Sequence, residues 1–153
     1  MKLKIQTKIL NSKIGTDFPL PDFATNGSAG MDLRACIDNA VTIPAGETVM
    51  IATGIAIYIA DPSIMAVLAP RSGLSFKHGI GLKNFIGIVD SDYQNEISIA
   101  VWNHGKQAYT IQPGDRICQM MFVPVIQPSL EIVTDFSDES QRGLGGWGHS
   151  GIQ

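Results

Sequence analysis

Short apolar runs of strand length alternate along the chain with polar positions rich in glycine, proline, asparagine and aspartate. In residues 47–59, ETVMIATGIAIYI, Ile55, Ile57 and Ile59 occupy every second position and would share one face of an extended strand. Further β-rich runs lie at residues 64–69, 85–89, 97–102, 108–111 and 117–126. Long helical periodicity is absent. The pattern predicts an all-β, jelly-roll-like sandwich or barrel.

Turn residues punctuate these runs, and one short helix is expected among them. The predicted chain reversals are Pro44-Ala45-Gly46, Asp61-Pro62-Ser63 and Pro113-Gly114-Asp115. The segment SGLSFKHG would form the helix, with Ser72 as its N-cap and Gly79 ending it in the left-handed conformation. Its first-turn amides, beside Arg71, would suit an anion. An ordinary helical connector is the alternative.

Composition narrows the class of protein. The 153 residues are 44% hydrophobic and 16% charged, which suits one folded domain with its own core. A net charge of −3 gives no basic field for nucleic acid or an anionic membrane, and no apolar run is long enough for a membrane span. Cys36 and Cys118 are too few for a disulfide framework, so we expect buried, reduced thiols in a soluble, cytoplasmic protein.

Five polar, glycine-punctuated segments interrupt the strands. They are AGMDLRA (29–35), PRSGLSFKHGI (70–80), GIVDSDYQNEI (87–97), GDRICQMMF (114–122) and RGLGGWGHSG (142–151). Taken singly, each has a structural explanation. Arg71 and Arg116 could form surface ion pairs of little energy, whereas Gln119, in an otherwise apolar run, needs partners for its amide if it is buried.

Asp90 follows an apolar run directly, where its carboxylate could act as a general base towards a water molecule. Asp-Ser-Asp is also an ordinary turn composition. His78, His104 and His149 lack the spacing of metal ligands, so we expect no protein-held metal, although Mg²⁺ could enter on a nucleotide. The glycine-rich segment RGLGGWGHSG is either an inert end or a segment that orders over a ligand.

In order, the five segments resemble the five motifs of the trimeric dUTP pyrophosphatases (dUTPases), most closely those of bacteria. The resemblance implies a jelly-roll subunit, a homotrimer and active sites shared between subunits. It also implies hydrolysis of dUTP to dUMP and pyrophosphate with Mg²⁺ on the triphosphate. That reaction would keep uracil out of DNA and supply dUMP for thymidylate synthesis.

The same resemblance implies roles for individual residues. Asp90 would be the general base for water attack at the α-phosphorus, and Asp32 would support that region. The residues implied for the triphosphate are Arg71, Ser72, Gly73, Gln119, Arg142 and Ser150. The residues implied for the nucleoside are Asn84, Gly87, Val89 and the hairpin from about 84 to 97 for the uracil edge, Tyr93 for the deoxyribose, and Trp147 over the base. Gly148 and His149 would belong to the same covering segment.

The chain departs from the family pattern at two positions. Trp147 stands where phenylalanine is usual, and its larger ring would keep the covering role. Asn95 stands where glycine is common, and asparagine tolerates a positive φ in a tight turn. The implied organisation is a catalytic domain over residues 1–135 and a flexible arm over residues 136–153. A dCTP deaminase of similar architecture and a non-catalytic nucleotide-sensing module are the competing hypotheses.

Overall fold

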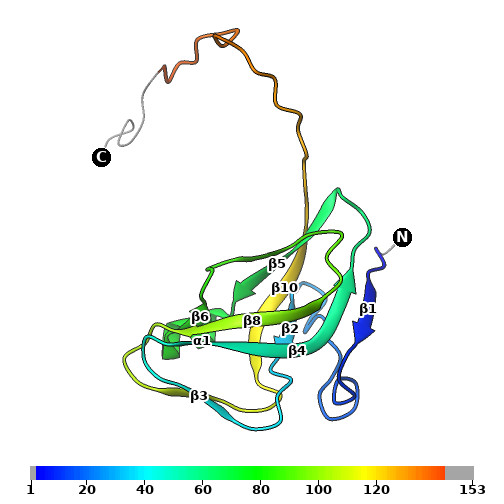
Figure 1. Cartoon of the computed structure of the whole chain (residues 1–153), viewed down its shortest axis with the longest axis vertical. Helices are drawn as coiled ribbons and strands as arrows, with labels where there is room; N and C mark the ends of the chain where they lie inside the picture. Colours follow the sequence, from blue (N-terminus) through cyan, green and yellow to red (C-terminus); the bar gives the residue numbers. More distant parts are fainter. Residues whose placement is uncertain (1–2, 144–153) are drawn as a thin grey trace.

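The computed structural model describes residues 3–143 and contains two four-stranded sheets, a two-stranded sheet and one short helix (Figure 1). The strands are β1 Gln6–Ile9, β2 Met31–Arg34, β3 Val41–Ile43, β4 Thr48–Tyr58, β5 Ile64–Pro70, β6 Ile80–Leu82, β7 Gly87–Val89, β8 Glu96–Asn103, β9 Tyr109–Ile111 and β10 Arg116–Pro124. The helix α1 spans Ser72–His78. The two larger sheets have the orders β1-β4-β8-β6 and β2-β10-β5-β7, and β3 pairs with β9. The all-β jelly-roll prediction with one helix is confirmed.

Alternation of side chains builds the core between the sheets. In β8, Ile97, Ile99 and Val101 are buried, while the residues between them are exposed or half-buried. This is the period of two that a strand with one face in the core requires. The six apolar runs correspond to β4, β5, β7, β8, β9 and β10.

The predicted reversals form as hydrogen-bonded turns. The amide of Glu47 donates to the carbonyl of Pro44, that of Ile64 to Asp61, and that of Asp115 to Gln112. Gly46 and Gly114 both have a positive φ, which explains why glycine occupies these turns. The turn chemistry read from the sequence is therefore correct.

Three local predictions were wrong. The N-cap of α1 is Arg71 in an extended conformation, and no side chain caps the helix, so Ser72 is the first helical residue. Gly79 does end the helix in the left-handed conformation, with φ 66°. The segment 84–97 is not a paired hairpin, because β7 pairs with β5 in one sheet while β8 pairs with β4 and β6 in the other. Asn95 has no positive φ, since Ala60 and Phe85 are the non-glycine residues with positive φ in the described part of the chain.

Beyond β10 the described chain runs away from the body without a further strand or helix (Figure 1). Several large apolar side chains on this segment are almost fully exposed, namely Ile126, Leu130, Ile132 and Phe136. The proposed boundary at residue 135 stays a prediction. Within residues 3–143, no helix combines the length and the apolar character needed to cross a membrane.

Candidate functional site

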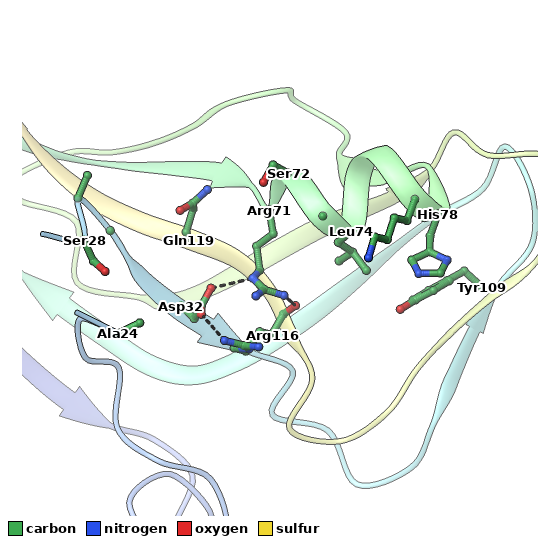
Figure 2. Close-up of a pocket in the computed structure, with 14 residues that line it drawn as sticks. Ala24, Ser28, Asp32, Arg71, Ser72, Leu74, His78, Tyr109, Arg116 and Gln119 are labelled. Atoms are coloured by element: carbon green, nitrogen blue, oxygen red, sulfur yellow. Dashed lines mark hydrogen bonds and ion pairs between the residues drawn. The ribbon is translucent and has the colours of Figure 1, made fainter.

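A polar pocket of about 580 Å³ lies where β2, β10 and the end of β5 meet the start of α1 (Figure 2). Strands β2, β10 and β5 are neighbours in one sheet, so residues far apart in the sequence are brought together. The predicted residues that line this pocket are Asp32, Arg71, Ser72, Gly73 and Gln119. The first, second and fourth motifs therefore meet at one place within the subunit.

Asp32 joins two arginines in the middle of this pocket. Its Oδ1 lies 2.8 Å from Nε of Arg71, and its Oδ2 lies 3.1 Å from Nη1 of Arg116 (Figure 2). The side chains of Asp32 and Arg71 keep only 25% and 28% of their surface exposed, so this pair is shielded more than a typical surface ion pair. Arg71 also donates from Nη1 to the carbonyl of Arg116 at 3.3 Å. The carboxylate fixes the orientation of both guanidinium groups and leaves their combined charge positive.

Gln119 belongs to β10 and lines the same pocket as these charged groups (Figure 2). It is half-buried, and its Nε2 donates to the carbonyl of Pro70 at 3.1 Å. Its backbone neighbours across the sheet are Asp32 in β2 and Ala69 in β5. The partner expected for this amide is thus present, and the side chain lies at the pocket wall.

Helix α1 forms one side of the pocket. Ser72, Gly73 and Leu74 line the pocket, and the first amides of a helix lack acceptors within the helix. Ser72 and Gly73 are exposed, and a Cβ on Gly73 would meet no atom within 4 Å. The expected anion-binding chemistry is therefore available beside Arg71.

The other end of the pocket was not predicted from the sequence. Lys77, His78 and Tyr109 line it, and the rings of His78 and Tyr109 lie 5.0 Å apart. Leu74 and His78 are four residues apart and therefore share one face of the helix. This spacing could have indicated from the sequence that His78 lines the same pocket as Leu74. Tyr109 comes from β9, and nothing in its local sequence marks it.

Asp90 lies apart from this pocket within the single chain. It is exposed directly after β7 and lines a second pocket of about 570 Å³ with Tyr58, Ala60, Ser91 and Asp92. Its predicted support from Asp32 does not occur within the subunit, because Asp32 lines the first pocket with Arg71. The candidate base and the candidate phosphate ligands therefore occupy two different hollows of one subunit.

The predicted base-reading residues lie along the edge strand β7 and the turn before it. Gly87 and Val89 are buried in β7, which within residues 3–143 pairs with β5 alone and has no strand along its other edge. A Cβ on Gly87 would lie 2.9 Å from Cβ of Leu68, which explains why glycine is required there. Asn84 is exposed, and its carbonyl accepts a 2.7 Å hydrogen bond from the amide of Ile86.

Tyr93 and Arg142 are both exposed, and neither lines the first pocket. The hydroxyl of Tyr93 donates to the carbonyl of Glu96 at 3.0 Å, and the residue as a whole is 40% exposed. Arg142 lies in a turn of the segment beyond β10. The predictions for Trp147, Gly148, His149 and Ser150 lie outside the described residues.

Metal-ligating groups do not converge in residues 3–143, where no three histidine, cysteine, aspartate or glutamate side chains gather as a metal site. Both carboxylate oxygens of Asp32 are already engaged by arginines. The two cysteines are free and buried, as predicted. Burial, reinforced by the negative charge of Asp32, raises the pKa of Cys118 to about 12, and burial also raises the pKa of Cys36.

Comparison with known proteins identifies the family of the chain. The dUTPase family model matches residues 16–151. The chain is 56% identical over its whole length, and over the whole of the relative, to a deoxyuridine 5'-triphosphate nucleotidohydrolase of Escherichia coli. It is 57% identical over 150 residues, 98% of this chain and 99% of the relative, to the protein of that name from Shigella boydii.

Solved structures share the fold at lower identity. A dUTPase of Staphylococcus bacteriophage 80alpha with dUpNHpp superposes with a TM-score of 0.85 at 24% identity, covering 99% of this chain and 100% of the phage chain. The D95N mutant of the phage phi11 dUTPase, described with a structural Mg(II) ion, gives a TM-score of 0.77 at 22% identity and covers 88% of this chain and 99% of its own. By its full-length relatives and by the family match, the chain belongs to the dUTPase family.

Proposed function

We propose that the protein hydrolyses dUTP to dUMP and pyrophosphate, with Asp90 as the general base for water attack at the α-phosphorus. The observation that carries this proposal is the pocket in which Arg71, Gln119 and the first turn of α1 converge. These groups offer a positive charge, an amide and free backbone donors, which is what a polyphosphate chain requires. The name of the relatives that match over the full length supports dUTP as the substrate.

The phosphate chain would occupy the first pocket. Arg71 is held by Asp32 with its guanidinium already oriented, so little side-chain entropy is lost when phosphate binds. Ser72, Gly73 and Gln119 would contact the α and β phosphates from α1 and β10. The substrate would be the Mg²⁺ complex, with the ion on triphosphate oxygens and water, because Mg²⁺ keeps several waters and needs few protein ligands. Bound there, the ion would neutralise part of the triphosphate charge.

The uracil would be read by backbone groups at the open edge of β7. An edge strand presents unpaired amide and carbonyl groups, and uracil carries both a donor and acceptors on its edge. Cytosine would leave some of those groups unpaired, which can discriminate by about 10⁴-fold. Asn84, Gly87 and Val89 belong to this region. Tyr93 would pack on the deoxyribose.

Asp90 must reach the phosphate of a nucleotide bound at Arg71, yet the two residues line different pockets of one subunit. We therefore include in the proposal a homotrimer in which neighbouring subunits share each site. Arg142 and Ser150 would meet the γ-phosphate, and Trp147, with Gly148 and His149 beside it, would cover the base. A cytoplasmic location also stays a prediction.

The experiment is to incubate the purified protein separately with dUTP, dCTP, dTTP and UTP, with MgCl₂ or with EDTA, and to measure pyrophosphate and ammonia. We expect pyrophosphate from dUTP alone, and more of it with MgCl₂. Ammonia released from dCTP would identify a deaminase and reject the proposal. Hydrolysis of all four nucleotides at similar rates would reject the base-reading role of β7.

The Asp90→Asn variant tests the base. Asparagine has nearly the same shape but cannot accept the proton of the attacking water, so kcat should fall at least about 10²-fold. Binding of a non-hydrolysable dUTP analogue should change by less than about threefold, because Asn keeps the local contacts. Near-normal kcat in this variant would remove Asp90 as the base.

A further inference from the structure

Ala60 adopts an unfavourable backbone conformation next to the candidate base. It lies just beyond β4, at φ 61°, and shares this left-handed region with one other non-glycine residue of the described chain, Phe85. Left-handed backbone is disfavoured for residues that carry a Cβ. Such conformations persist where the surrounding structure requires them, and they cluster at functional sites.

The conformation directs the amide of Ala60 at the loop that follows β7. This amide donates to the carbonyl of Ser91 at 2.9 Å, and Ser91 is the residue after Asp90. The turn that follows Ala60 has its own hydrogen bonds, from the amide and the hydroxyl of Ser63 to the carboxylate of Asp61. The Ala60–Ser91 hydrogen bond is therefore not needed for that turn. It joins the β4–β5 connection to the β7–β8 loop.

The position of Asp90 depends on its backbone. In the described part of the chain no hydrogen bond or ion pair holds its carboxylate. The contacts that fix the segment are the pairing of Val89 with Ala66, the 3.2 Å hydrogen bond from the amide of Tyr93 to the carbonyl of Asp90, and the Ala60–Ser91 bond. Asp90, Ser91 and Ala60 line the same pocket.

We propose that Ala60 is a positioning residue for Asp90: its left-handed backbone holds the Ser91 carbonyl and thereby sets where the Asp90 carboxylate stands. This inference rests on the proposed role of Asp90 as base. It adds a residue outside the five motif segments to the reaction. It also explains why a strained alanine is tolerated at the end of β4.

Substitutions at position 60 test the inference. Ala60→Pro removes the amide hydrogen and fixes φ near −65°, so kcat for dUTP should fall at least about tenfold. The Kd for a non-hydrolysable dUTP analogue should stay within about threefold, because β7 is held by its own pairing with β5 and the phosphate ligands lie on other elements. Ala60→Gly keeps the amide and favours positive φ, so kcat should stay within about twofold of the unaltered protein. A proline variant with kcat within twofold would overturn the proposal.

A second variant covers the case in which Ala60→Pro does not fold. Ala60→Val keeps the amide but disfavours the left-handed backbone, so kcat should fall about threefold to tenfold with the same Kd. The double variant Ala60→Val/Asp90→Asn should have the same residual kcat as Asp90→Asn alone, because Ala60 acts through the Asp90 carboxylate. An unchanged kcat for Ala60→Val would overturn the inference. So would a double variant whose kcat lies below that of Asp90→Asn by the same factor that Ala60→Val alone loses.

These outcomes separate the inference from the proposed function. If Asp90→Asn retains turnover, the base assignment fails whatever the variants at position 60 do. If Asp90→Asn is inactive while Ala60→Pro and Ala60→Val keep full kcat, only the role of Ala60 fails.

Discussion

Cys118 is fully buried in β10, and its thiol is therefore held in the neutral form. Its pKa rises to about 12, first because of burial and second because Asp32 carries a negative charge nearby. Thiol reagents attack the thiolate, so a buried thiol with a raised pKa is unreactive. Cys36 is also buried with a raised pKa.

We expect both thiols to react with an aromatic disulfide reagent at pH 8 at least about 100-fold more slowly in the native protein than in guanidinium chloride. Fast labelling of one thiol in the native protein would contradict this.

The raised pKa of the Cys118 thiol predicts that the protein loses stability at alkaline pH. The folded pKa of Cys118 lies above that of an unfolded thiol, so above about pH 9 the unfolded chain binds fewer protons than the folded one. The free energy of unfolding should therefore be unaffected by this thiol below about pH 8.5 and should fall by up to about 1.4 kcal/mol per pH unit between about pH 9 and 12. Urea titrations at pH 8, 9 and 10 measure the slope. Cys118→Ala removes the thiol and should show a shallower slope; equal slopes would contradict the assignment.

At the scale of elements, the end of α1 depends on a close backbone approach. Gly79 has φ 66°, and a Cβ there would lie 2.6 Å from both Cα and N of Gly105. The amide of Gly79 also donates to Ser75 and its carbonyl accepts from His104, so the backbone cannot move without losing hydrogen bonds. Gly79→Ala should lower the free energy of unfolding by roughly 2–4 kcal/mol. Gly27→Ala is the matched control, since a Cβ there meets no atom within 4 Å; it should change stability by less than about 0.5 kcal/mol. Equal effects of the two substitutions in urea titrations would contradict the close-contact argument.

Long strands with a clear alternation could be predicted from the sequence, and several strands of three or four residues could not. The strand β8 has a clear alternation, whereas all four residues of β1 are exposed and β3 and β6 have three residues each. Such strands carry no periodic signal. The hairpin prediction failed because proximity in sequence favours pairing of β7 with β8, while both strands find longer partners elsewhere.

Some features of the candidate site could be predicted from the sequence, and others depend on the fold. Residue types predicted an anion site beside Arg71, and the resemblance to the dUTPases implied that Gln119 contacts the same triphosphate. The structure brings these two side chains together at one pocket. The bridging of Arg71 and Arg116 by Asp32 could not be predicted from local sequence, because it depends on the strand order β2-β10-β5. Ala60 was equally hidden, since its significance lies in its φ and not in its side chain.

For the whole molecule, the separation of Arg71 and Asp90 into two pockets leads to a test of shared sites. If each site takes Arg71 from one subunit and Asp90 from its neighbour, Arg71→Ala and Asp90→Asn damage different halves of a site. Each variant alone should be nearly inactive. In trimers assembled from equal amounts of both, one site in four combines two intact halves, so about a quarter of the activity of the unaltered protein should return. Refolding the two variants together and measuring pyrophosphate release gives this number, and refolding each variant alone is the control. Active sites contained within single subunits would restore nothing, because every subunit in the mixture carries one of the two substitutions.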